Sequence, residues 1–329
     1  MLKLFQNNNP LLLPATLIYV IVLRMSIFIF PKETDNSLWL NPLSELLNRL
    51  TGLSIYQSLI HDVLSIVIVF ASALIATNVI NNYKLIERPG YMPALIYTLC
   101  ASFTAEFCEL SPALCGFFFL QFAFFTVIKM YKKDKAGGSM FNSGFFIGIA
   151  SLFYLPYLSF ILFLIGGYIL SRPFVLRELL SGILGIVIPL YFAAVIYFLN
   201  DSFREYLHSL LAQYDIEQVQ QIQETLIPIA IRLSALLFVF IIASFSVRGN
   251  YNKMVMQNRV IITLCFVFFF AGSCSTLFIH DNGMSHYIWI ALPFTLIVSI
   301  FVTQFRKAWM AEILQLCLLL LSFYFQYFH

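Results

Sequence analysis

The sequence predicts an all-α, polytopic membrane protein. Of its 329 residues, 60% are hydrophobic and only 11% are charged, and the mean hydropathy is +0.87. Soluble domains contain about 45–50% apolar and about 25% charged residues. Several apolar stretches approach or exceed the roughly 18 residues that cross a bilayer, and no window alternates like a strand of a membrane barrel. We therefore expect a transmembrane helix bundle that forms a single integral membrane domain over residues 1–329.

Apolar windows, and the polar breaks between them, predict about eleven helices. Their expected limits are 11–30, 57–80, 92–107, 112–130, 141–154, 156–171, 179–199, 225–246, 259–278, 286–304 and 308–327. Pro156 divides the stretch 141–171, which is compatible with a shallow hairpin or with one long, kinked span. If the two halves form one span, the C-terminus changes sides and everything before residue 141 is unaffected.

Lys and Arg are distributed unevenly over the expected loops. One alternate set of loops contains Lys3, Lys84, Arg88, Lys129, Lys132, Lys133, Lys135, Arg172, Arg177, Arg248, Lys253, Arg259, Arg306 and Lys307. The other set contains Lys32, Arg49 and Arg204. By the positive-inside rule the N-terminus is cytoplasmic, and we expect the protein in the inner (plasma) membrane. The basic residues form no single patch, so nucleic acid is not an expected partner.

Acidic residues have the opposite distribution, on the outer side or at its edge. Eleven of the 16 acidic residues are expected there: Glu33, Asp35, Glu45, Glu106, Glu109, Asp201, Glu205, Asp215, Glu217, Glu224 and Asp281, and His208, His280 and His286 accompany them. Any chemistry is therefore expected on the outer side. The alternative for each single residue is that it only solvates its loop.

The outer segments have distinct patterns. In residues 31–56, Leu43, Leu46, Leu47 and Leu50 recur at helical spacing after Trp39, which predicts a helix in the membrane interface. Residues 200–224 predict an amphipathic helix followed by a glutamine-rich stretch, and HDNGMSH at 280–286 is a shorter polar loop.

The segment AEFCELSP at 105–112 contains the most conspicuous carboxylates. Glu106 and Glu109 are three residues apart, so on a helix they would share one face. Apolar sequence lies on both sides of this very short loop. Because carboxylates near bilayer depth are costly and often functional, both are candidate site residues.

Arg24 and Arg232 lie inside apolar spans, near their outer ends. A guanidinium there needs a carboxylate, a carbonyl or an anionic ligand to offset its burial. A lipid phosphate fits its planar fork, whereas snorkelling to the interface is the alternative. His61 and Asp62, near the outer end of the second span, are candidate partners for either arginine.

Residues 142–192, NSGFFIGIASLFYLPYLSFILFLIGGYILSRPFVLRELLSGILGIVIPLYF, resemble the middle of the polyprenyl-phosphate-dependent, integral-membrane glycosyltransferases of the GT-C superfamily. In that pattern a short helix with small residues leads to a hairpin, a basic cytoplasmic turn and a glycine-bearing helix. The matching residues are Gly144 and Gly148, then Arg172, Pro173 and Arg177, then Gly182 and Gly185. Small residues at this spacing allow close helix approach, so the pattern concerns packing and not chemistry.

The layout of residues 10–200 also resembles that superfamily. Its members have an acidic residue in a long first outer loop, then an interfacial helix, and often an acidic group between the third and fourth spans. Glu33 or Asp35 takes the first position here, and Glu106 or Glu109 the second. Thr34 separates Glu33 from Asp35, and no large soluble C-terminal domain is present, unlike the family pattern. Residues 1–200 would form the GT-C-like module and 201–329 a C-terminal bundle.

The resemblance implies transfer of a sugar from a polyprenyl-phosphate donor to an acceptor on the outer side. Arg232 or Arg24 would bind the lipid phosphate. Asp35 or Glu33 would act as general base. Glu106 or Glu109 would orient the acceptor, or hold a divalent metal through oxygen ligands.

Two other functions are compatible with the sequence. The first is a non-catalytic subunit or scaffold of a cell-envelope complex with a membrane-protein partner. It is favoured by the 36 phenylalanines and the absence of HExxH, GxSxG and P-loop motifs. The second is a transporter or flippase, which the apolar span centres disfavour. The whole chain also resembles uncharacterised bacterial polytopic families of similar length.

Overall fold

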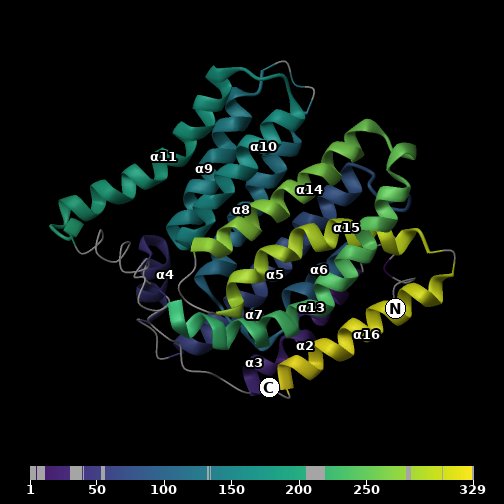
Figure 1. Ribbon diagram of the computed structural model, residues 1–329. Helices are drawn as coiled ribbons and strands as arrows, with labels where there is room; N and C mark the ends of the chain where they lie inside the picture. The colour runs from purple at the N-terminus through teal and green to yellow at the C-terminus, as the bar shows by residue number, and fades with distance from the viewer. Residues whose placement is uncertain are drawn as a thin grey trace.

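The computed structural model confirms the all-α fold (Figure 1). It describes residues 5, 12–29, 39, 41–52, 56–131, 133, 135–204, 219–278, 283–305 and 307–327, with the side chains of 219–228 and 308 excluded. Within these ranges every regular element is an α-helix or a 3₁₀ helix.

The elements follow one another in a simple order. The first group is α2 (Leu12–Leu23), α3 (Met25–Ile29), α4 (Pro42–Gly52), α5 (Gln57–Asn82), α6 (Met92–Ala101), α7 (Ala105–Cys108) and α8 (Pro112–Ile128). The second is α9 (Gly137–Phe153), η2 (Leu155–Phe160), α10 (Ile161–Ser171) and α11 (Leu176–Leu199). The third is α13 (Val219–Gly249), η4 (Tyr251–Lys253), α14 (Met256–Ser275), η5 (Thr276–Phe278), η6 (Met284–Ile290), α15 (Ala291–Thr303) and α16 (Ala308–Tyr327).

Six helical stretches among the described residues are long and apolar enough to cross a membrane, as is typical of a membrane protein. They are Gln57–Asn82, Leu176–Leu199, Ile229–Gly249, Met256–Phe278, Met284–Thr303 and Trp309–Tyr327. Other apolar helices, such as α6 and α8, are shorter. The apolar segment of residues 12–29 is divided into α2 and α3 by a turn at Arg24. The expected count of about eleven spans is therefore not confirmed.

The stretch 141–171 forms a hairpin and not one kinked span. Helix α9 ends at Phe153, and Pro156 lies in the first turn of η2. The carboxylate of Glu178 accepts hydrogen bonds from Ala136 N, at the start of α9, and from Tyr168 Oη, near the end of α10. The start of α9 and the end of α10 thus lie at the same end of the bundle.

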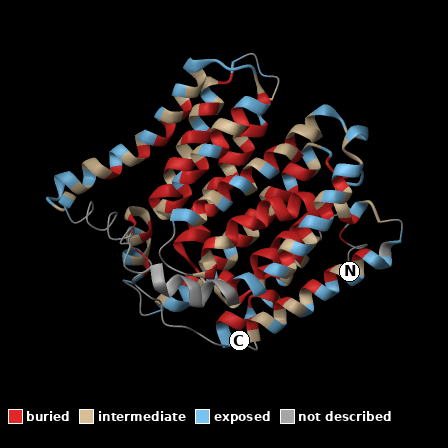
Figure 2. Ribbon diagram, viewed as in Figure 1, coloured by how far each residue is buried: buried red, intermediate tan, exposed pale blue. Residues whose placement is uncertain are grey.

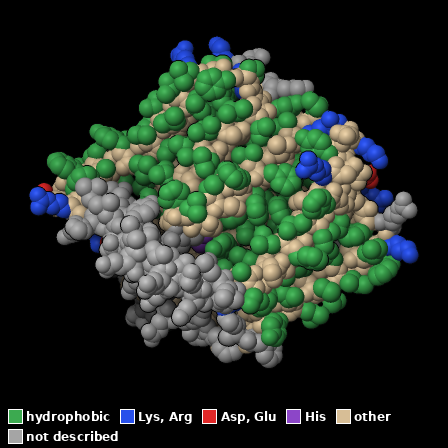
Figure 3. Space-filling model, in the orientation of Figure 1, with side chains coloured by type: hydrophobic (Ala, Val, Ile, Leu, Met, Phe, Trp, Pro, Cys, Tyr) green, Lys and Arg blue, Asp and Glu red, His purple; other side chains and the backbone are tan. Residues whose placement is uncertain are grey.

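The helices run back and forth between two ends, which we call the α7 end and the opposite end. At the opposite end Tyr91 N donates to Phe5 O (2.8 Å), and Ser246 Oγ donates to Gln304 Oε1 (2.9 Å). Most of the Lys and Arg side chains visible in Figure 3 lie along the rim formed by the loops of this end. The Lys and Arg residues that the sequence places in one alternate set of loops therefore lie mainly at one end of the fold.

Residues from both parts of the chain form one buried core (Figure 2), and many of them are phenylalanines. The ring of Phe268, in α14, lies 5.5 Å from that of Phe124 in α8 and 5.2 Å from that of Phe163 in α10, centroid to centroid. Such edge-to-face pairs are a favoured aromatic geometry. The expected modules 1–200 and 201–329 share one hydrophobic core.

Helix α4 occupies the segment where an interfacial helix is expected. Leu46 and Leu50 are exposed, whereas Trp39, just before it, is buried. Tyr197 Oη in α11 donates to Glu45 Oε2 at 3.0 Å and ties the helix to the bundle. The helix itself is confirmed, and its place in the membrane interface stays a prediction.

Helices α9 and α11 pack through the glycines of the small-residue pattern. A Cβ atom on Gly144 would overlap the carbonyl oxygen of Gly182, and one on Gly148 would lie 2.7 Å from Ile186 O. A Cβ on Gly185 would overlap the carbonyl oxygen of Phe141. Backbone approach this close is possible only for glycine, so the prediction that this pattern serves packing is confirmed.

Substitution of Gly144 by alanine should separate α9 from α11. We expect a cost of about 1–3 kcal/mol, because the new methyl group meets backbone that cannot rotate away. Thermal unfolding of the detergent-solubilised protein measures it. The control is Gly138→Ala, in the same helix with no atom within 4 Å of the new Cβ, which should leave the melting temperature unchanged or slightly raised. Equal melting temperatures for both variants would contradict the packing account.

Candidate functional site at the α7 end

Arg24 lies at the centre of the α7 end and is completely buried. It occupies the turn between α2 and α3. Its Nε donates to Ser102 Oγ (3.1 Å) and its Nη1 to Cys108 O (2.9 Å). Its Nη2 donates to Ala101 O (2.9 Å) and Phe107 O (2.7 Å). One side chain thereby joins α2 and α3 to the α6–α7 turn.

Three of the four acceptors of Arg24 are backbone carbonyls that the ends of short helices leave unpaired. Helix α6 ends at Ala101, and α7 is a single turn that ends at Cys108. The last carbonyls of a helix lack intrahelical donors and carry partial negative charge. A guanidinium can satisfy several of them at once. The charge of Arg24 is therefore offset by carbonyl dipoles.

Helix α16 completes this polar cluster. Ser322 Oγ donates to Ser102 O at 2.8 Å, and Gln326 Nε2 donates to the same oxygen. Nearly all N–H groups of Arg24 already have acceptors inside the protein. The prediction that Arg24 binds a lipid phosphate stays untested, and this geometry favours a structural role instead.

Glu106 and Arg232 form an ion pair beside this cluster. Arg232 Nη1 lies 3.0 Å from Glu106 Oε1, and Met284 N donates to Glu106 Oε2 at 2.6 Å. The Arg232 side chain is 12% exposed and that of Glu106 33% exposed. Three elements distant in sequence, α7, α13 and η6, therefore meet at one partly exposed carboxylate.

The expectation that Glu106 and Glu109 share one helix face is wrong. Helix α7 ends before Glu109, whose backbone is extended (φ −70°, ψ 150°). Glu106 contacts α13 and η6, whereas the charge of Glu109 acts on that of Asp62 in α5. The two carboxylates thus have different neighbours.

His61 and Asp62 are not the partners of the two arginines. The His61 Nε2 atom lies 2.7 Å from Thr51 Oγ1, and the His61 ring lies 5.5 Å from that of Trp39. Arg24 is bound to carbonyls and Arg232 to Glu106. His61 instead anchors α4 to α5.

Several predicted positions lie outside the described residues. Glu33 and Asp35 are among them, as are His208, Asp215, Glu217, His280 and Asp281, and the side chain of Glu224. The glutamine-rich stretch before α13 is likewise outside, apart from its last residues in that helix. Within the described ranges no group of three or more His, Cys, Asp or Glu residues could hold a metal ion, and the six cysteines are free.

A buried histidine near this site forms a polar cluster that sequence patterns did not reveal. His286 Nδ1 lies 3.2 Å from Tyr154 Oη, and His286 Nε2 lies 3.0 Å from Ser275 Oγ. These residues belong to η6, the α9–η2 turn and the end of α14. His286 was recognisable as part of a polar loop, whereas its partners lie in apolar segments and have no distinguishing pattern.

Two neighbouring cavities, which share some of their lining residues, lie along α13 between the α7 end and the opposite end. The larger, of about 1150 Å³, lies between α13 and α14 with Trp289 and Ile290 among its lining residues. The smaller, of about 550 Å³, is lined by Ile229, Leu233 and Leu237 near the α7 end. Both include Tyr287, the third residue after Met284. Figure 3 shows this hydrophobic hollow on the face of the molecule.

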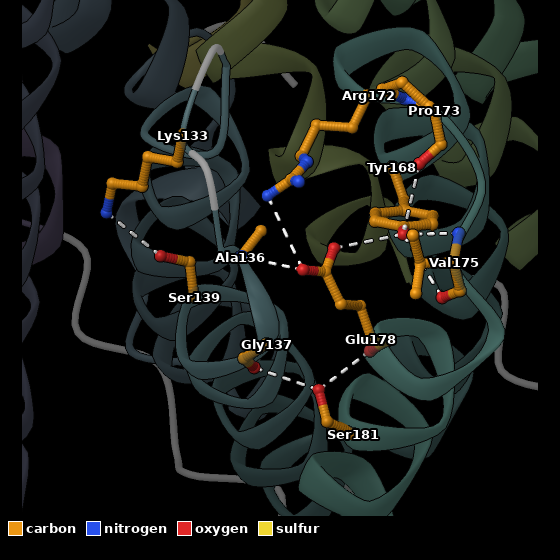
Figure 4. Close-up of polar contacts among 10 residues, drawn as sticks. All are labelled: Lys133, Ala136, Gly137, Ser139, Tyr168, Arg172, Pro173, Val175, Glu178 and Ser181. Carbon is orange, nitrogen blue, oxygen red and sulfur yellow. Dashed lines mark hydrogen bonds and ion pairs between the residues drawn. The ribbon is translucent and has the colours of Figure 1, made fainter.

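A second carboxylate, that of Glu178, organises the opposite end and is 13% exposed (Figure 4). It accepts from Ala136 N at 2.9 Å and from Tyr168 Oη at 3.1 Å, and Arg172 Nη1 lies 3.6 Å away. Ser181 Oγ donates to Gly137 O at 2.9 Å. The basic turn around Arg172 therefore holds the α9–α10 hairpin against α11. All the groups that make these contacts belong to this chain.

Replacement of Arg24 by methionine should destabilise the protein by about 3 kcal/mol or more, because it leaves several buried carbonyls without donors. The control is Arg49→Met, which removes an exposed pair with Glu45 and should cost at most about 0.5 kcal/mol. Thermal unfolding and the yield of monodisperse protein measure both. A normally stable Arg24→Met variant would contradict the structural role.

Comparisons with known proteins identify a family and no activity. Neither a curated protein nor a solved structure matches the chain. Residues 43–329 match DUF6427, described as a family of unknown function. This range includes Glu106, Glu109, Arg232 and most of the fold. Because the match extends over most of its length, the chain belongs to the DUF6427 family.

Proposed function

We propose that the protein transfers a sugar from a polyprenyl-phosphate donor to an acceptor at the α7 end, on the outer side of the inner membrane. The observation that carries the proposal is the Glu106–Arg232 pair beside the smaller α13 cavity. A partly exposed cation next to an apolar, chain-sized cavity is suited to a ligand with a phosphate and a hydrocarbon tail.

Arg232 is placed to receive the donor's phosphate. It lies on α13 between Ile229 and Leu233, which line the cavity. The isoprenoid chain would lie along these residues and Leu237. Its phosphate would take the place of the Glu106 carboxylate on the guanidinium, an exchange of one anion for another. Glu106 would remain hydrogen-bonded to Met284 N.

The transfer itself requires a general base. The acceptor hydroxyl oxygen bonds to the anomeric carbon as the bond from that carbon to the phosphate oxygen breaks, which inverts the centre. The hydroxyl proton passes to a carboxylate, and polyprenyl phosphate leaves as the anion held by Arg232. Glu109, beside Asp62, is a described candidate for the base. The GT-C resemblance assigns the same role to Asp35 or Glu33.

A second candidate function is that of a non-catalytic subunit of an envelope complex. Helix α11 favours it, because its distal half extends past α9 (Figure 1). Tyr191, Phe192, Ile196 and Phe198 on this half are 58–67% exposed. In a membrane this face contacts lipid or a partner helix. Co-purification of a stoichiometric partner that is lost in an Ile196→Arg variant would support this function.

The transferase proposal predicts that Arg232→Gln lowers transfer on the order of 10²-fold. The protein, in nanodiscs, would be supplied with polyprenyl-phosphate sugars, and released polyprenyl phosphate would be measured. Alanine at Glu33, Asp35, Glu106 and Glu109 together should abolish release. The control is Arg204→Gln, which changes an exposed basic residue expected on the same side of the membrane. Full activity of the fourfold alanine variant in folded protein would overturn the proposal.

The proposed orientation predicts which cysteines a membrane-impermeant maleimide reaches from outside intact cells. In a background with Cys274 and Cys317 replaced by serine, Glu109→Cys should be labelled from outside. Lys253→Cys, at the opposite end, should be labelled only after the membrane is opened. The reverse pattern would place the α7 end in the cytoplasm, contrary to the proposal.

A further inference from the structure

The larger cavity has a chemistry that the proposed transfer does not use. One face of α13 borders it, including Leu237, Ile241, Ser244 and Arg248, and its wall is otherwise mainly apolar. The rings of Phe240 and Phe269 stack 4.8 Å apart, where α13 and α14 approach each other. Arg248 is the one Lys or Arg among the lining residues, and it lies at the opposite end of the bundle.

We propose that this groove binds an anionic phospholipid of the inner leaflet, with its phosphate at Arg248 and its acyl chains between α13 and α14. From Leu237 to Arg248, α13 rises about 16 Å at ~1.5 Å per residue. This is about half of the ~30 Å hydrocarbon core. The inner half of the groove therefore has the length of one leaflet. The outer half remains for the donor chain.

The charges at the mouth of the groove are complementary to a phosphate. Arg248 is exposed, and no ion-pair partner for it occurs within the described part of the chain. Lys253, in η4, is a second exposed cation on the same short connection. Tyr251 and Asn252 also line the groove and supply hydrogen-bonding groups.

The connection that carries these groups is held in place by its own contacts. Arg259 Nη2 donates to Asn252 O at 2.6 Å and Arg259 Nε to Met254 O at 3.0 Å. The same guanidinium lies 5.6 Å from the centre of the Tyr251 ring. Tyr251 Oη is also 3.2 Å from Thr263 Oγ1. Arg259 thus holds the connection between α13 and α14 in place. Arg248 takes no part in these contacts, and its guanidinium would bind the headgroup.

The basic rim explains why the lipid should be anionic. The cytoplasmic leaflet carries negative surface potential, and each nearby Lys or Arg gains about 1 kcal/mol, or about fivefold in affinity. A zwitterionic lipid of the same chains would gain much less, because its headgroup carries no net charge. The site does not depend on the proposed transferase activity, since neither Glu106 nor Arg232 takes part in it.

Native mass spectrometry of the detergent-solubilised full chain tests the proposal. Phosphatidylglycerol and phosphatidylcholine with identical acyl chains are added separately. We expect one phosphatidylglycerol per chain, at concentrations where phosphatidylcholine is not retained. Arg248→Gln should weaken its binding about fivefold. Arg177→Gln, at the same end but on α11, should leave binding unchanged. Equal retention of both lipids would overturn the headgroup assignment.

A second pair of variants tests the position of the acyl chains. Ile241→Trp places a large ring in the groove and should abolish binding, whereas Ile242→Trp, on an exposed part of α13 outside the groove, should not. Thermal unfolding checks that both variants fold. Unchanged binding in folded Ile241→Trp protein would overturn the site. Inorganic phosphate should not displace the lipid, and displacement would show a phosphate site that needs no chains.

Discussion

A guanidinium that is wholly buried in an apolar bundle must have an acceptor for nearly every N–H group, and Arg24 obtains them from the α6–α7 turn. The turn in its own helix, the short length of α6 and the single turn of α7 all follow from this arrangement. Each break exposes carbonyl groups that one continuous helix would have used internally. Removal of either partner would leave the other unpaired at a cost of several kcal/mol.

The position of the candidate site depends on that turn. Because Arg24 and α16 hold the backbone of residues 101–108, Glu106 is directed toward α13 and η6, where it meets Arg232 and Met284 N. Glu109 follows the same turn, and its charge acts on that of Asp62 in α5. The site therefore combines a rigid backbone with carboxylates that point to two different regions. Preorganisation of this kind is what group transfer requires.

The groove along α13 supplies a second constraint. Helices α13 and α14 approach at Phe240 and Phe269 and leave an apolar cavity on the outward side of that contact. Its two ends carry different cations, Arg232 at the α7 end and Arg248 at the other. A hydrocarbon groove with a cation at each end is suited to one lipid from each leaflet. The proposed donor and the proposed phospholipid would then be neighbours.

Sequence patterns predicted the all-α fold, the close packing at Gly144 and the conspicuous position of Glu106, because these depend on composition and local spacing. The partners of Arg24 were not predictable, since backbone carbonyls have no residue type. Glu178 was overlooked because its partners come from three separate elements. The groove was not predictable because residues 233–247 of α13 are mainly apolar on every side, so they show no stripe that distinguishes packed from open faces.

The most direct measurement is an experimental structure in nanodiscs of native lipid supplemented with a polyprenyl-phosphate sugar. The account predicts a phosphate at Arg232 in place of the Glu106 carboxylate, with its chain along Ile229 and Leu233. An intact Glu106–Arg232 pair, with the outer half of the groove closed by side chains at saturating donor, would contradict it.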